Sequence, residues 1–148
     1  MNKIININSN IEYSEAIYNI ENSCFPEDSW SLDSIRSSIL NQHSLIFVCI
    51  IDDEVVGFIN LYNICGEAEL NRIAVLKEFR RHNIAVSLLK TAIEHLLSEG
   101  CSKIILEVRS LNAAAINLYK KLGFTVDGVR KKYYQNPSDD AVLMSVNI

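Results

Sequence analysis

The spacing of apolar and polar residues divides the chain into segments of two kinds. Segments that alternate or are wholly apolar, and that end in turn residues, predict strands. We expect these strands over residues 4–8, 45–51, 55–61, 68–75, 103–108, 124–134 and 141–147. Segments with apolar residues three and four positions apart predict helices. We expect these helices over residues 11–24, 31–40, 86–100 and 112–122.

Capping and turn residues support several of these boundaries. Ser31 and Asn112 stand where a helix N-cap is expected. Gly100 and Gly123 follow helical segments directly, where glycine commonly ends a helix. The pair Asp52-Asp53 lies between two apolar runs and predicts the turn of a β-hairpin.

The order of the elements predicts the fold class. A strand is followed by two helices, three strands, a helix, a strand, a helix and two strands, the last two around a loop at residues 136–140. This order is typical of a mixed α/β domain with a largely antiparallel first half and βα units in the second. The run Ile104-Ile105-Leu106 is continuous rather than alternating, so we expect its strand to be buried on both faces. The length of 148 residues suits one domain over residues 1–148.

Composition excludes several classes of protein. With 49% hydrophobic and 22% charged residues, the chain is neither disordered nor fibrous. Its longest apolar run, over residues 45–51, is far shorter than the ~20 residues of a membrane helix. The first residues lack the apolar region of a signal peptide, so we expect a soluble cytoplasmic protein without a membrane partner. A net charge of −4 argues against direct binding of nucleic acid.

The cysteines and histidines give no sign of a metal site. Cys24, Cys49, Cys65 and Cys101 have neither metal-ligand nor redox spacing, and the three histidines are scattered. We expect the cysteines to be small buried hydrophobic side chains in a reducing compartment. No metal is predicted.

A basic turn between a strand and a helix is the first candidate site. The glycines form neither a dinucleotide-binding motif nor a P-loop, so neither NAD nor ATP is indicated. Between Arg72 and Arg81, however, four basic residues stand against one acidic residue, directly before a helix. A helix N-terminus carries unpaired N–H groups and partial positive charge, which favour phosphate. A solvated basic turn is the alternative interpretation.

A strand followed by a helix forms the second candidate. Glu107 is a carboxylate near the C-terminal end of an otherwise apolar strand, where α/β proteins place ligands. Asn112 and Tyr119 are seven residues apart and therefore share one helix face, roughly 10 Å apart. Ala115 lies between them and leaves a shallow groove. Taken singly, these residues also fit an edge glutamate, a helix cap and a packed tyrosine.

Together the two stretches resemble the GNAT superfamily of acetyl-CoA-dependent N-acetyltransferases. One superfamily motif, R/Q-x-x-G-x-G/A, is similar to the sequence at residues 80–85. A second motif of the superfamily, Asn-x-x-Ala-x-x-Leu-Tyr-x-x-x-Gly-Phe, is matched over residues 112–124. Within the superfamily the chain resembles the RimI-type ribosomal-protein-alanine N-acetyltransferases. That resemblance is carried by the sequences at 71–75, 106–109 and 112–116 and by Arg130, Tyr133 and Tyr134.

One residue departs from the superfamily motif. Asn83 stands where the motif has its central glycine, and Ala85 is the permitted second residue. Asparagine is the non-glycine residue that best tolerates a positive φ, so we expect the phosphate-binding turn to persist.

The resemblance implies a fold and a cosubstrate. It implies a mixed, mostly antiparallel central sheet with a splayed parallel strand pair and about four helices. It also implies acetyl-CoA as cosubstrate, without a metal. The residues implied to bind it are Ile73, Ala74 and Val75 for pantetheine, Arg80, Arg81, His82, Asn83, Ile84, Ala85 and Val86 for pyrophosphate, and Asn112.

The resemblance also implies a reaction. An amine attacks the thioester directly, with Glu107 as the base and Tyr119 as the acid. Glu69 is a second carboxylate that could act as the base. Tyr133 and Tyr134 are implied to clasp the acceptor, but consecutive strand residues face opposite ways, so we expect only one to reach the site.

Trp30 has two interpretations. Its position before the Ser31 cap, with Ile35 four residues after that cap, is typical of a hydrophobic staple. The resemblance adds that Trp30 lies in the loop that covers the acceptor site in relatives.

The implied acceptor is the N-terminal alanine of a small-subunit ribosomal protein. One alternative is a small amine such as a polyamine or an amino sugar, against which the pair Tyr133-Tyr134 points to a peptide. The other alternative is a non-catalytic acyl-CoA-binding module. Asn83 keeps that alternative open, whereas the presence of both Glu107 and Tyr119 argues against it.

Overall fold

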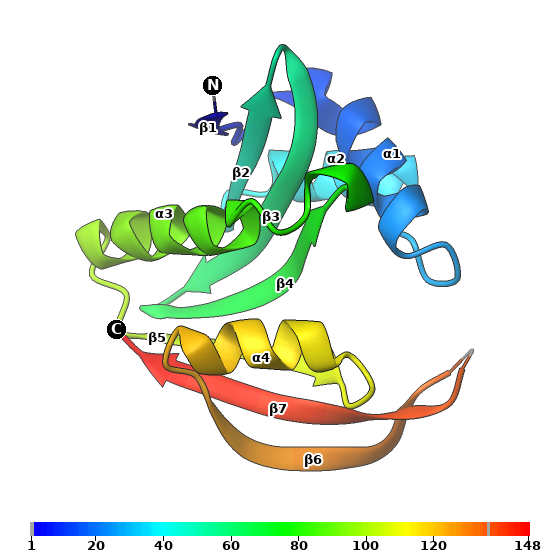
Figure 1. The fold of residues 1–148 in the computed structure, drawn as a ribbon. Helices are drawn as coiled ribbons and strands as arrows, with labels where there is room; N and C mark the ends of the chain where they lie inside the picture. Colours follow the sequence, from blue (N-terminus) through cyan, green and yellow to red (C-terminus); the bar gives the residue numbers. More distant parts are fainter. Residues whose placement is uncertain (1, 136) are drawn as a thin grey trace.

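Seven strands form one sheet in the computed structural model, which describes residues 2–135 and 137–148 (Figure 1). The strands are β1 (Asn2–Asn6), β2 (Ser44–Ile51), β3 (Glu54–Ile64), β4 (Glu67–Val75), β5 (Lys103–Arg109), β6 (Thr125–Tyr134) and β7 (Asp139–Asn147). Their order across the sheet is β1-β2-β3-β4-β5-β7-β6, and β4 and β5 form its parallel pair. The predicted fold class is confirmed. Residue 136 of the expected loop lies outside the described residues.

Four helices accompany the sheet, as expected. They are α1 (Ser14–Cys24), α2 (Leu32–Leu40), α3 (Ile84–Ser98) and α4 (Ala113–Lys121), with short 3₁₀ turns at Ile11–Tyr13 and Lys77–Phe79. The predicted caps are confirmed, since Ser31 Oγ accepts from the Ser34 N–H at 3.1 Å and Asn112 Oδ1 from the Ala115 N–H at 3.1 Å. Among the described residues, no helix is long and apolar enough to cross a membrane.

The helices cover the two faces of the sheet unequally (Figure 1). On one face, α3 and α4 pack against the sheet from β2 to β7, with Leu88, Leu89 and Leu96 fully buried. On the other face, α1 and α2 pack against β2, β3 and β4. The second face is therefore open over β5 and its C-terminal neighbours.

The predicted burial of β5 on both faces is wrong. Burial alternates along the strand: Ile104, Leu106 and Val108 are buried under α3 and α4, whereas Ile105 is half-buried and Glu107 is partly exposed. The cause is the position of α1 and α2, which lie over β2 to β4 and leave the second face of β5 uncovered. A continuous apolar run does not reveal this, because Ile105 is apolar but only half-covered.

Two smaller expectations also differ from the structure. The first strand spans Asn2–Asn6 rather than 4–8, and Asn8 instead bonds β2 through its side chain, accepting from the Ile46 N–H at 2.9 Å. Cys65 is exposed rather than buried, because it lies in the tight β3–β4 turn with φ 54°. Cys49 and Cys101 are buried as expected, and Cys24 is half-buried.

A β-bulge bends β4 where it separates from β5. The parallel pairing ends at Leu70, which is opposite Leu106. On the other side of β4, Asn60 of β3 pairs with Arg72 but Leu61 pairs with Leu70, so Asn71 is an extra residue. A bulge bends its strand and increases the local twist. The bulge thus turns β4 away from β5 and opens a notch between the two strands.

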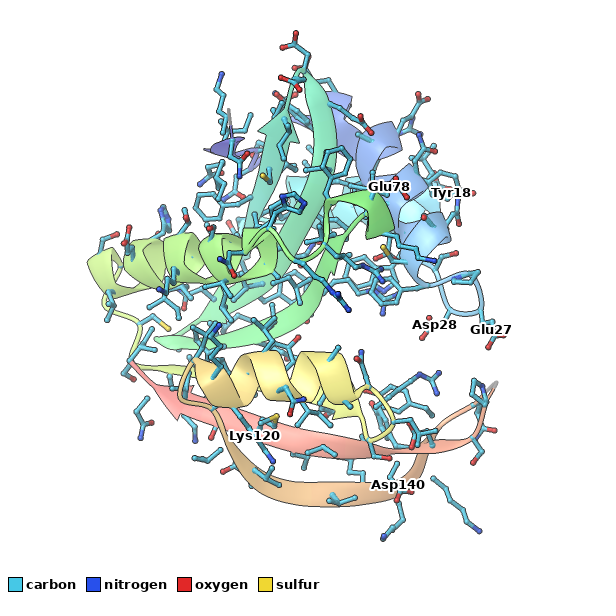
Figure 2. All side chains as sticks on the ribbon, in the orientation of Figure 1. Tyr18, Glu27, Asp28, Glu78, Lys120 and Asp140 are labelled. Atoms are coloured by element: carbon cyan, nitrogen blue, oxygen red, sulfur yellow. The ribbon has the colours of Figure 1, made fainter. Side chains whose placement is uncertain are left out.

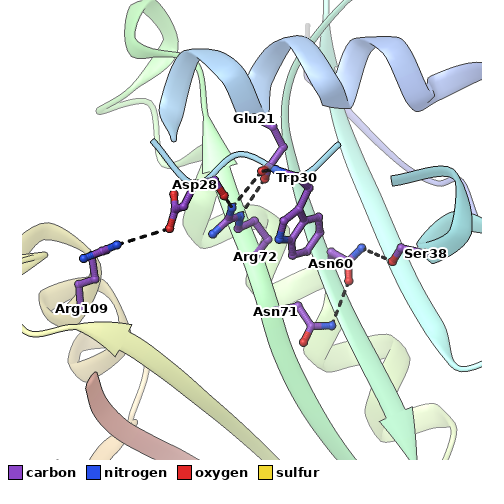
Figure 3. Close-up of polar contacts among 8 residues, drawn as sticks. All are labelled: Glu21, Asp28, Trp30, Ser38, Asn60, Asn71, Arg72 and Arg109. Carbon is purple, nitrogen blue, oxygen red and sulfur yellow. Dashed lines mark hydrogen bonds and ion pairs between the residues drawn. The ribbon is translucent and has the colours of Figure 1, made fainter. Parts of the chain in front are cut away.

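Buried side-chain hydrogen bonds fix this bulge (Figure 3). Asn71 Nδ2 donates to Asn60 Oδ1 at 3.2 Å, and Asn60 Nδ2 donates to Ser38 Oγ of α2 at 2.8 Å. Asn60 is only 3% exposed. The shape of β4 therefore depends on a polar contact with a helix on the second face.

Replacing Asn60 with alanine should destabilise the protein by about 1–3 kcal/mol, because the buried Ser38 hydroxyl and the half-buried Asn71 amide each lose a hydrogen bond. The free energy of unfolding from urea denaturation measures this loss. Asn63→Ala on the same strand is the matched control: its Oδ1 is buried without a partner among the described residues, so the loss should be smaller. Equal losses for the two variants would contradict this role of Asn60.

Candidate active site

Two cavities meet at the notch between β4 and β5. The larger, of about 460 Å³, lies beside the start of α3 and is called the α3 cavity. The smaller, of about 160 Å³, contains Glu107 and is called the Glu107 cavity. Residues that line both are Phe25, Ile73, Asn112 and Ala115. The two cavities are therefore adjacent and separated only by these shared residues.

Most residues predicted to bind acetyl-CoA line the α3 cavity. They are Ile73, Ala74, Val75, Arg80, Arg81, Asn83, Ile84, Ala85, Val86 and Asn112. His82 is exposed and is not part of this lining. The strand end, the turn and the two helix starts thus come together as one surface.

The start of α3 leaves its backbone donors free. Asn83 has φ 58° and ψ 23°, the left-handed conformation that asparagine tolerates best among non-glycine residues, and its side chain makes no capping hydrogen bond. Among the described residues, no group accepts from the N–H groups of Ile84, Ala85 or Val86. A helix start of this kind favours an anion.

The turn is less basic than its sequence indicates. Arg72 is not free, because its guanidinium bonds both carboxylate oxygens of Glu21 at 2.9 and 3.0 Å. Arg80 Nε donates to the Val75 carbonyl at 3.0 Å. Exposed Arg81, with φ 67°, lines the α3 cavity and makes no side-chain bond among the described residues. Arg81 is therefore the arginine of this turn that can face a ligand.

Glu107 and Tyr119 line the same small cavity in different environments. Burial raises the pKa of Tyr119 well above its usual value, and the neighbouring Tyr134 adds to the shift. Tyr119 therefore keeps its proton at neutral pH. The carboxylate of Glu107 is partly open to solvent and lies 3.8 Å from the guanidinium of Arg130. The cavity thus offers a proton donor and a carboxylate.

The structure separates the two consecutive tyrosines. Tyr134 lines the Glu107 cavity, and burial followed by the charge of Glu107 raises its pKa. Tyr133 is 48% exposed, and its ring stacks edge-on against Tyr134 with 5.1 Å between centroids. Of this pair, Tyr134 is the one that lines the cavity.

Glu69 and Trp30 line neither the α3 cavity nor the Glu107 cavity. Glu69 lies with Tyr62 and Ile105 at a separate hollow of about 350 Å³ on the open face of the sheet. Trp30 belongs to the loop of residues 25–31, which joins α1 to α2, and its backbone N–H donates to a carboxylate oxygen of Glu21 at 2.9 Å. Its ring lies 4.9 Å from the Arg72 guanidinium.

The pair Glu21–Arg72 is the feature that sequence reasoning missed (Figure 3). Glu21 is fully buried, and the Arg72 guanidinium stacks over the Phe25 ring at 4.1 Å. Arg72 also donates to the Asp28 carbonyl at 2.9 Å, so it holds the α1–α2 loop beside both cavities. A signal was present, because Glu21 follows Ile17 and Ile20 on the apolar face of its helix, where a carboxylate needs a buried partner.

The Acetyltransferase (GNAT) family profile matches residues 14–124. The chain belongs to the GNAT family. It is 33% identical over 137 residues to the [ribosomal protein bS18]-alanine N-acetyltransferase of Escherichia coli K12, covering 90% of each chain. The crystal structure of the Escherichia coli ribosomal-protein-S18-alanine N-acetyltransferase has a TM-score of 0.92 and 31% identity, and covers 100% of this chain and 94% of that one.

A more distant GNAT structure shares the fold. The PaiA N-acetyltransferase of Thermoplasma acidophilum, solved in complex with coenzyme A, has a TM-score of 0.83 at 21% identity and covers 100% of this chain and 99% of that one. As a member of the GNAT family the chain is an N-acetyltransferase. Enzymes of this family use acetyl-CoA. Within residues 2–135 and 137–148, no cluster of three or more His, Cys, Asp or Glu side chains could hold a metal ion.

The raised pKa of Tyr119 should appear in the alkaline stability of this GNAT domain. An unfolded tyrosine ionises near pH 10, whereas folded Tyr119 keeps its proton to higher pH. Between these pKa values the unfolded state binds fewer protons, so stability falls as pH rises above about 10. Tyr119→Phe removes this contribution, and urea denaturation at several pH values should show a shallower alkaline decline than in the parent. A difference that stays constant with pH would contradict the shift.

Proposed function

We propose that this protein transfers the acetyl group of acetyl-CoA to the α-amino group of an N-terminal alanine, on a small-subunit ribosomal protein. The observation that carries the proposal is that the α3 cavity adjoins the cavity that holds Glu107 and Tyr119 and shares four lining residues with it. The choice of acceptor is supported by the 33% identical Escherichia coli relative, which is a [ribosomal protein bS18]-alanine N-acetyltransferase.

The α3 cavity fits the cosubstrate. The N–H groups at residues 84–86 and exposed Arg81 suit a pyrophosphate, and Asn83 gives the close backbone approach. Among the described residues, the edge of β4 that faces β5 has no strand partner beyond Leu70. Apart from the Val75 carbonyl, which Arg80 occupies, the backbone of this edge at Ile73–Val75 is therefore available for the amide groups of pantetheine. Acetyl-CoA supplies the thioester-activated acetyl group. Asn112 lies where the two cavities join and contacts both substrates.

Glu107 and Tyr119 supply the two proton transfers. An α-amino group has a pKa of about 7.7–8.0 and lysine about 10.4, so neutralising the amine at pH 7 costs about 1 kcal/mol instead of about 4.6. A partly exposed carboxylate such as Glu107 is a sufficient base for an α-amine. The amine nitrogen attacks the thioester carbonyl directly and loses its proton to Glu107. Tyr119 donates its hydroxyl proton to the departing sulfur.

The acceptor can be tested with peptides. A peptide that begins with the alanine of the ribosomal protein should gain one acetyl group on its α-amine, as located by fragment mass spectrometry. The same peptide with a blocked N-terminus should gain none on its lysines, because their amines are harder to neutralise. Transfer to spermidine or an amino sugar in place of the peptide would overturn the proposal.

The acid–base roles predict two different losses. Tyr119→Phe should lower kcat by roughly 10²–10⁴ while coenzyme A still binds in calorimetry. Glu107→Gln should also spare binding, and it should lose rate most at low pH, where the amine is mostly protonated. Glu69→Gln is the matched control, because Glu69 lies outside the Glu107 cavity. A pH–rate profile of Glu107→Gln that runs parallel to the parent's would contradict its role as base.

A further inference from the structure

Two loops from different halves of the molecule flank the Glu107 cavity. The α1–α2 loop extends from the half that contains β1 to β4, and the β6–β7 connection belongs to the half that contains β5 to β7 (Figure 1). Only the four residue pairs of β4 and β5 join these halves within the sheet. In Figure 2, Asp28 lies at the tip of the α1–α2 loop and points toward the second half.

Asp28 is held from two sides. Its carbonyl accepts from Arg72 Nη2 at 2.9 Å, and its carboxylate Oδ2 lies 3.7 Å from Arg109 Nη2 of β5 (Figure 3). Among the described residues, this is the one ion pair that connects the α1–α2 loop with the half containing β5 to β7. Asp28, Arg72 and Arg109 all line the Glu107 cavity.

Arg109 also fixes the opposite loop. Its Nη1 donates to the Pro137 carbonyl at 2.8 Å, its Nη2 donates to the Gln135 carbonyl at 3.0 Å, and its guanidinium lies 4.5 Å from the centre of the Tyr134 ring. A guanidinium presents five N–H donors in a rigid planar fork and a flat face that stacks on a ring, whereas a lysine ammonium is a compact point charge with three donors. One side chain thus connects the β6–β7 connection, Tyr134 and the α1–α2 loop.

We infer that Asp28 and Arg109 form a latch that sets the width of the acceptor entrance, and that both are positioning residues for acceptor binding. The inference rests on the proposed function, in which the Glu107 cavity receives the acceptor. The carboxylate of Asp28 is 44% exposed, and an exposed pair of this length stabilises weakly. The latch can therefore open while the carbonyl bonds keep Arg109 in place.

The latch predicts a change in acceptor affinity without a change in chemistry. Asp28→Asn should raise the KM for the alanine peptide about two- to fivefold, the range expected for losing one exposed ion pair. The kcat and the Kd of coenzyme A should stay at parent values, because Asp28 is assigned no proton transfer and does not line the α3 cavity. Asp28→Glu keeps the charge and should restore most of the acceptor affinity. Arg109→Gln removes the same ion pair and should raise the KM more than Asp28→Asn, because it also loses the two guanidinium bonds to the carbonyls of Gln135 and Pro137.

Two further measurements separate a latch from a general loss of stability. The double variant Asp28→Asn/Arg109→Gln should raise the KM by less than the product of the single effects, because each single variant removes the same ion pair. Backbone hydrogen exchange in the α1–α2 loop should be faster in both single variants than in the parent. This measurement needs no acceptor and does not depend on whether the protein is active. Lys131→Gln removes the exposed 3.4 Å pair with Asp140 on the β6–β7 hairpin and is the matched control, which should match the parent in every measurement.

The results distinguish the latch from the proposed function. Parent activity on the alanine peptide tests the proposed function alone, and loop exchange tests the latch without any acceptor. An unchanged KM together with unchanged exchange in Asp28→Asn would overturn the latch. Additive effects in the double variant would overturn it as well.

Discussion

The extra residue in β4 is the constraint on which the site depends. Without Asn71 the strand would continue beside β5, and the parallel pair would close the space between them. The bulge turns β4 away after Leu70. Asn71 donates to Asn60, and Asn60 in turn donates to Ser38 of α2, so this chain of hydrogen bonds anchors the turn in the core. The α3 cavity and the Glu107 cavity adjoin where these strands separate, so the inserted residue shapes the place where the two cavities meet.

The residue after the bulge positions the loop above it. Arg72 forms a buried ion pair with Glu21, and such pairs lose hydration that their mutual attraction must offset. Here the geometry is favourable, since the guanidinium makes two bonds to the carboxylate, one to the Asp28 carbonyl and a stacking contact with Phe25. The ion pair also positions the α1–α2 loop: Phe25 lines both cavities, and Asp28 lies within ion-pair distance of Arg109.

Unequal helix coverage gives Tyr119 and Glu107 their different environments. Tyr119 belongs to α4 and is buried against the core on the covered face, so ionisation is unfavourable and its pKa is raised. Glu107 projects from β5 onto the face that α1 and α2 leave open, where solvent and Arg130 surround its carboxylate. The notch lets one cavity contact both faces, and this brings a retained proton and an exposed carboxylate into the same small space.

Local sequence determined most of the elements, and the tertiary structure decided what they face. The caps at Ser31 and Asn112, the order of strands and helices and the left-handed Asn83 follow from interactions within a few residues, which a sequence pattern records directly. The motifs also indicated the residues that line the α3 cavity. The exposure of Glu107, the removal of Glu69 to a separate hollow and the pairing of Glu21 with Arg72 depend instead on where distant segments pack. Those contacts join residues as many as 51 positions apart, and no local spacing encodes which of several charged residues will meet.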